Sequence, residues 1–157
     1  MTKQNDSSEQ QAAEAMIRRR VAEFLGTTLE PKRLTLGAGA GIQVDGVAPD
    51  NLAFVEIRAR QGALKGGQKH KVANDALKLI TLRRDYPDAR LAIVFADELA
   101  ADYATKGTWM AEALAAWNVE VIVVEIDEEV RAGVRAAQVR QEMVSPEASP
   151  PADAELD

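Results

Sequence analysis

Two near-continuous apolar runs constrain the fold of this chain more than any other feature. They cover residues 91–96 and 119–126, and each has the length of a single strand. Runs without polar alternation are typical of central strands that are covered on both faces. A helical stretch lies between the two runs and suits a right-handed parallel crossover. The sequence therefore predicts a sheet with helices on both sides.

The segment before these runs predicts a helix, three strands and a second helix. Ser7 and Gln10 have the spacing of a capping box, and Gly26 is a stop signal, which together indicate a helix from about Ser8 to Leu25. The second helix is expected to end near Arg84, before a Pro-containing turn. Strands are expected at 32–36, 42–45 and 52–60. The predicted architecture is a mixed sheet flanked by helices.

A chain of 157 residues is expected to form one domain, at 8–126. We expect a charged helix at 127–143, and disorder at 1–7 and in the acidic segment 144–157. Trp109 and Trp117 fall in a predicted helix and are expected to pack in the core or against a partner. No apolar stretch approaches the ~20 residues that span a bilayer, so a cytoplasmic protein without a membrane partner is expected.

Composition limits the chemistry of any metal site. The chain has no cysteine and one histidine, which excludes disulfides, thiolate zinc sites and imidazole-rich clusters, so a metal would be bound by oxygen. The net charge is -6, but nine Lys and Arg lie between Glu56 and Arg90 against four acids. This basic stretch could face phosphates. The alternative is a solvated helix with ordinary ion pairs.

Two carboxylates are predicted to face each other across a hairpin. If Asp50 and Asn51 form a two-residue loop, Asp45 lies opposite Glu56, with Cβ atoms about 4.5–5.5 Å apart. Like charges repel at this distance, and a hard divalent cation such as Mg²⁺ or Mn²⁺ between them would offset the repulsion. Alternatively, Asp45 closes a strand, Glu56 pairs with Arg58 or Lys71, and the set forms a polar strand edge without metal.

These residues carry a family resemblance. Val44-Asp45-Gly46, followed by Val55-Glu56-Ile57-Arg58, resembles the D…(D/E)XK signature of the PD-(D/E)XK nuclease superfamily, and the order of elements agrees from about Gln10 to Ile126. The resemblance implies a restriction-endonuclease-like α/β domain with an αβββαβ core plus a further helix and strand. It also implies magnesium-dependent hydrolysis of phosphodiester bonds in DNA, as in repair or defence.

The resemblance assigns a role to each site residue. Asp45, Glu56 and the main-chain carbonyl of Ile57 would hold Mg²⁺ or Mn²⁺. Arg58 stands where the family has lysine, and a guanidinium stabilises phosphate but does not readily exchange a proton. We expect Lys71 to compensate as a catalytic residue, ahead of Lys65 or Lys69. The residues expected to contact nucleic acid are Lys65, Gln68, Lys69, Lys71 and Lys78.

Two further residues are candidates. Glu14 lies on the apolar face of the first helix, where family members often carry another acid, although a simple surface glutamate is the more ordinary interpretation. His70 adjoins the site in sequence and could shuttle a proton near neutral pH, although a single exposed histidine usually has no such role.

Three classes of function are consistent with this pattern. The first is a DNA endonuclease, and the second is a catalytically inactive nuclease-like domain that binds nucleic acid or a protein partner through 68–84. The third is an α/β protein that binds a small molecule. Since a small chain has little surface for reading a long site, a homodimer or a larger complex is expected in the first two cases.

Overall fold

The computed structural model describes residues 2–144, so Met1 and 145–157, most of the predicted acidic tail, lie outside the described residues. The helices are α1 (Thr2–Leu25), α2 (Gly66–Leu82), α3 (Glu98–Thr105), α4 (Trp109–Ala116) and α5 (Glu128–Val144). The strands are β1 (Glu30–Thr35), β2 (Gly41–Val47), β3 (Ala53–Arg58), β4 (Arg90–Phe95) and β5 (Val119–Val123).

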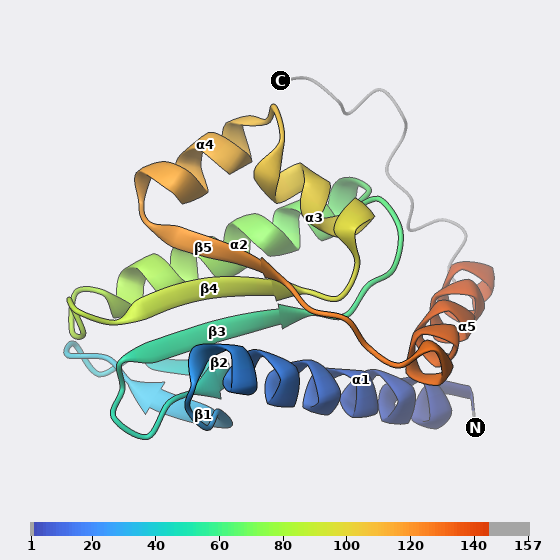
Figure 1. The fold of residues 1–157 in the computed structure, drawn as a ribbon, viewed down its shortest axis with the longest axis horizontal. Coiled ribbons are helices and arrows are strands. Elements are labelled where there is room, and N and C mark those ends of the chain that lie inside the picture. The colour runs from blue at the N-terminus through green and yellow to red at the C-terminus, as the bar shows by residue number, and fades with distance from the viewer. Residues whose placement is uncertain (1, 145–157) are drawn as a thin grey trace.

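The five strands form one mixed sheet in the order β1-β2-β3-β4-β5 (Figure 1). The first three strands pair antiparallel, and β3, β4 and β5 pair parallel. Helices flank the sheet, so the predicted mixed α/β class is confirmed. No helix among the described residues is long and apolar enough to cross a membrane.

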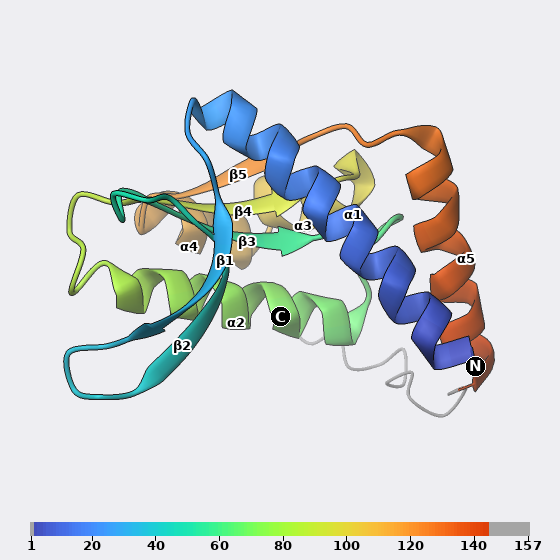
Figure 2. The same ribbon diagram turned by 90° about the horizontal axis from the view of Figure 1, so that it is seen from below.

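Two hydrophobic cores lie on the two faces of the sheet. On one face, α1 packs over Val55, Val94 and their neighbours, and on the other face α2, α3 and α4 pack over Phe54 and Ile93. Every residue from Leu91 to Ala96 is buried. The prediction of a strand covered on both faces is therefore confirmed for this run. It is wrong for the run at 119–126, because β5 is an edge strand in which Val123 is exposed. Figure 2 shows α5 lying alongside α1 rather than on the sheet.

The first helix begins earlier than predicted. Residues 2–7, which were expected to be disordered, belong to α1. The segment contains neither Gly nor Pro, so nothing in it prevents the helix from extending past the capping signal at Ser7. The last helical residue is Leu25. Gly26 follows it with a φ of +70°, as expected of a glycine after a helix C-terminus.

The core prediction for the two tryptophans is wrong. The exposed fractions of Trp109 and Trp117 are 60% and 59%, whereas Met110 and Leu114 of the same helix are buried. Trp109 is the first residue of α4 and lies beside the buried stripe of Met110 and Leu114, whereas Trp117 follows the last helical residue and leaves the helical path.

Candidate functional site

The sheet splits beside Asp45. Strand β2 pairs with β1 along most of its length, but with β3 only through Gly46 to Val55 and Val47 to Phe54. At Asp45, the residue before Gly46, the polar groups have partners outside the β2–β3 pairing. The carboxylate Oδ2 of Asp45 accepts a hydrogen bond from the Ile57 N–H at 2.9 Å, and Arg18 Nε of α1 donates to the Asp45 carbonyl at 2.8 Å. Asp45 is thus held from both sides.

Gly46 allows the close approach of the two strands next to this split. A Cβ at position 46 would lie 2.6 Å from Cγ2 of Val55. Real Cβ atoms do not come so close to another carbon, so the backbone of β2 can reach β3 only with glycine here.

Asp45 and Glu56 face each other as the sequence predicts. The pairs 46 with 55 and 47 with 54 give the predicted register, and position 45 opposite 56 is its next step. Glu56 is only 1% exposed. Burial raises the pKa of Glu56 from 4.5 to about 8, Asp45 acts in the same direction, and Lys78 lowers it. Near neutral pH Glu56 therefore keeps its proton to a large extent.

Helix α2 supplies the cation that meets Glu56. Lys78 Nζ forms an ion pair with Glu56 Oε1, and the Lys78 side chain is 31% exposed. The predicted compensating lysine, Lys71, lies two turns earlier on the exposed side of α2. The expectation that Lys71 is the lysine at the carboxylate pair is not met in the structure. Both lysines fall on one side of α2 by helical period, and the turn of α2 that lies beside Glu56 is the one that carries Lys78.

Arg58 is paired with a second buried acid. Its Nε and Nη2 atoms lie 2.5 Å from Oδ2 of Asp75, which is 3% exposed. Burial raises the pKa of Asp75, while Arg58 and then Lys78 lower it. The sequence pattern placed Asp75 on the polar face of this helix, but it lies among the buried residues Val72, Ala76 and Leu79.

Glu14 belongs to the same charge cluster. It is half-buried on α1, and burial and then Asp45 raise its pKa, whereas Arg18 and Arg58 lower it. The cluster thus draws side chains from four elements. Its members are Glu14, Arg18, Asp45, Glu56, Arg58, Asp75 and Lys78.

The remaining predicted residues lie outside this cluster. Lys65 and His70 are exposed, and Gln68 is half-buried at the start of α2. Lys69 Nζ lies 5.4 Å above the ring of Tyr103. These positions surround the beginning of α2, so they form a rim of the site rather than its centre.

Sequence reasoning missed Arg18 and Asp75 as members of the site. A signal for Asp75 was present, because positions 72, 75, 76 and 79 share one face of a helix and the other three are apolar. The contact of Arg18 with the Asp45 carbonyl depends on how α1 crosses the sheet, for which the sequence has no local signal.

Two carboxylates of the cluster are groups of the kind that hard divalent cations bind. Among residues 2–144, no group of three or more His, Cys, Asp or Glu side chains is arranged to hold a metal ion. The chain thus supplies the Asp45 and Glu56 carboxylates, and Mg²⁺ commonly binds through one or two carboxylates and keeps several waters. A buried acid with a raised pKa beside a second acid is an arrangement that a cation would stabilise.

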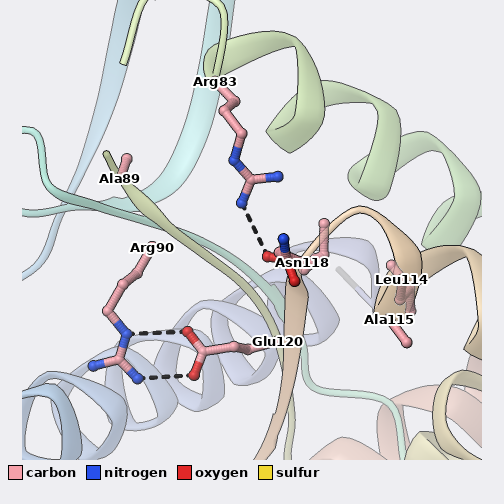
Figure 3. A pocket seen from close by; sticks show the side chains of 8 residues that line it. Arg83, Ala89, Arg90, Leu114, Ala115, Asn118 and Glu120 are labelled. Carbon is pink, nitrogen blue, oxygen red and sulfur yellow. Dashed lines mark hydrogen bonds and ion pairs between the residues drawn. The ribbon is translucent and has the colours of Figure 1, made fainter. Parts of the chain in front are cut away.

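A pocket lies at the opposite end of the parallel strands (Figure 3). Its lining includes Arg90 and Glu120, which form a two-point ion pair at 3.0 and 2.8 Å. Arg83 donates to the carbonyls of Trp117 and Asn118 at the end of α4. The polar groups that line this pocket are thus paired with one another.

Comparison of the chain with protein-family models, with curated proteins and with solved structures gave no match in any of the three. The geometry of the site is therefore what bears on function.

Proposed function

We propose that this protein is a metal-dependent nuclease that hydrolyses phosphodiester bonds in DNA and has a restriction-endonuclease-like fold. The observation that supports this most is the buried Asp45 and Glu56 pair at the split of the sheet, with Lys78 in contact with Glu56. A sequence selected for stability alone would rarely place two acids together where burial opposes their charge.

The arrangement of elements supports the fold proposal. The order α1-β1-β2-β3-α2-β4 is the helix, three strands, helix and strand that the family resemblance implies. The antiparallel meander leads into parallel pairing of β3 with β4, and both halves of the sequence motif lie at the split between β2 and β3.

The residues of the cluster divide the proposed work among them. Asp45 and Glu56 would hold Mg²⁺ or Mn²⁺, which when bound supplies an activated water and positive charge beside the phosphate. Lys78 places an ammonium group at Glu56, where it can orient a phosphate oxygen and exchange a proton. Arg58 carries a guanidinium, a group that does not readily exchange a proton, so its proposed contribution is electrostatic stabilisation.

Exposed cations border the site on one side. Lys65 precedes α2, and Lys71 lies on its second turn, near Gln68. Side chains of this kind contact phosphates without reading sequence. In a chain with a net charge of -6, such a local basic rim is where a nucleic-acid backbone would dock.

A second candidate is the inactive nuclease-like domain, which binds nucleic acid or a protein without cutting. It is favoured by the internal pairing of the cluster, in which Glu56 meets Lys78, Asp75 meets Arg58 and Asp45 meets the Ile57 N–H. A polar network that is satisfied internally can serve structure alone.

Binding of a small molecule has less support. In sheets with parallel strands, ligands usually bind beyond the carboxyl ends of the strands. At the ends of β3 and β4, the chain's own Gln61, Gln138 and Arg131 fill this position.

The decisive experiment is incubation of the purified full chain with supercoiled plasmid and single-stranded DNA at low salt, with Mg²⁺ or Mn²⁺. We expect metal-dependent cleavage that is lost in Glu56→Gln and retained in Glu112→Gln, which alters an exposed acid of α4. If the wild-type protein gives no metal-dependent product but binds DNA in a salt-sensitive manner, the inactive domain is correct and the nuclease is not.

A further inference from the structure

Gln61 closes the end of the sheet next to the site. It lies three residues after Arg58, in the connecting segment 59–65 between β3 and α2, and is 5% exposed. Its Nε2 atom donates to the carbonyl oxygens of Ala59 at 3.0 Å and Ala96 at 3.4 Å. A single side chain thus binds the main chain just beyond both β3 and β4.

Gln138 of α5 holds the main chain of Gln61 through two reciprocal hydrogen bonds. The Gln61 N–H donates to Oε1 of Gln138 at 2.7 Å, and Nε2 of Gln138 donates to the Gln61 carbonyl at 3.0 Å. Arg131 lies two helical turns before Gln138 on α5. Its Nη1 atom donates to Gln61 Oε1 at 2.5 Å. The donors and acceptors match, so the pair can be broken only by leaving buried polar groups unsatisfied.

Helix α5 is itself fixed to the rest of the protein. Val134 and Ala137 are buried, and Arg140 Nη2 lies 2.6 Å from Oε2 of Glu9 on α1. The connecting segment is tied a second time by the Gly62 N–H, which donates to Asp97 Oδ2. The position of Gln61 therefore depends on α5 and, through it, on α1, as well as on the neighbours of Gln61 in sequence.

The connecting segment is anchored in the core by Leu64, but its backbone on either side of Leu64 contains glycine. Gly62 has a φ of +86°, and two further glycines, Gly66 and Gly67, begin α2. The same stretch contains Lys65 and leads directly to Gln68 and Lys71. These three side chains belong to the polar rim proposed to contact nucleic acid. Glycine-rich backbone samples many conformations unless external contacts restrict it.

We propose that Gln138 is a positioning residue, which holds the connecting segment and the first turn of α2 where they can contact a nucleic-acid backbone. This inference rests on the proposed function for its ligand, since it takes that ligand to be DNA. The proposal assigns a function to α5, which is not part of the αβββαβ core that contains the motif residues.

The test compares Gln138→Leu with the wild type in the binding of a duplex oligonucleotide, without divalent metal and over a series of salt concentrations. Removal of the reciprocal bonds frees the segment, so binding weakens at each salt concentration. The slope of log affinity against log salt decreases by about 0.9 for each phosphate that the protein no longer touches. Arg131→Met, which removes the bond to the Gln61 side chain and the ion pair with Glu128 on the same helix, is expected to change the slope in the same direction.

Two control variants separate positioning from general stability. Val134→Ala weakens the packing of α5 and is expected to lower the melting temperature with an unchanged salt slope. Gln141→Leu changes an exposed glutamine of the same helix and is expected to alter neither. An equal change of slope in Val134→Ala, or an unchanged slope in Gln138→Leu, would overturn the inference.

Hydrogen exchange reports the same interaction without DNA. The amide of Gln61 should exchange faster in Gln138→Leu and at the wild-type rate in Gln141→Leu, and an unchanged rate would overturn the inference. Cleavage is scored separately, so a changed salt slope without any cleavage by the wild type refutes the nuclease but supports the positioning role. Failure of the wild type to bind DNA overturns both.

Discussion

Lys78 forms an ion pair with Glu56, while Arg58 occupies the motif position in which the family has lysine. The two cations come from different elements, the lysine from α2 and the arginine from β3, and each meets its own buried acid. A group that can exchange a proton is therefore present at the carboxylate pair, although the sequence motif itself lacks one.

Replacement of this lysine should separate it from its neighbours on α2. In Lys78→Met we expect the rate of metal-dependent DNA cleavage to fall by about a hundredfold or more, the usual range for losing a general acid or base. Lys71→Met, on the exposed side of the same helix, should weaken DNA binding at low salt and change the rate at saturation little. Equal losses of rate in the two variants would contradict the assignment of Lys78.

The raised pKa of Glu56 predicts a pH dependence of stability. Folded Glu56 keeps its proton between pH 4.5 and about 8, where the unfolded chain has lost it, so the folded state binds more protons in that window. The free energy of unfolding should therefore decrease as the pH rises from 4.5 to 8. Chemical denaturation of Glu56→Gln should show a smaller decrease, and Glu112→Gln should retain the full one. A wild-type stability that rises over this window would refute the raised pKa.

Metal binding should release a proton. A carboxyl group must be ionised to bind a divalent cation, and Glu56 has a pKa raised to about 8. The apparent affinity for Mn²⁺ is expected to rise by about tenfold per pH unit up to pH 8 and to level off above it. Titration calorimetry in two buffers of different ionisation enthalpy counts the released proton. An affinity that is independent of pH would contradict the pair as ligands.

The close approach of β2 to β3 should make Gly46 irreplaceable. An added Cβ would overlap Val55, and we expect Gly46→Ala to lower the free energy of unfolding by about 1–3 kcal/mol. Gly67→Ala is the matched control, because no atom lies within 4 Å of its added Cβ and the residue is helical. That change should stabilise the protein by about 0.5–1 kcal/mol. Urea denaturation of the two variants measures both effects, and similar stabilities would contradict the overlap.

The sheet was predictable where local signals agreed with the final packing. The apolar run at 91–96 predicts a strand covered on both faces because a solvent-exposed face would require alternation. The register that sets Asp45 opposite Glu56 followed from the turn at Asp50 and Asn51, since side chains alternate with a period of two.

The rest of the site depends on tertiary geometry. Lys71 and Lys78 both lie on α2, and only the way this helix crosses β3 decides which one reaches Glu56. A charged residue is rarely buried without a partner, and the partner of Asp75, Arg58, comes from another element, so the sequence of the helix does not show the ion pair that permits its burial. Gln138 binds Gln61 across 77 residues of sequence, a separation at which periodicity contains no information.

That separation also bears on the biosynthesis of the protein. Among the described elements α5 is made last, so a nascent chain can form β1 to β5 and α2 before Gln138 has left the ribosome. Until then the segment that follows Arg58 lacks its hydrogen bonds to α5, whereas the bonds of Gln61 to Ala96 and of Gly62 to Asp97 can already form. The sheet and α2 are therefore in place before α5 binds Gln61.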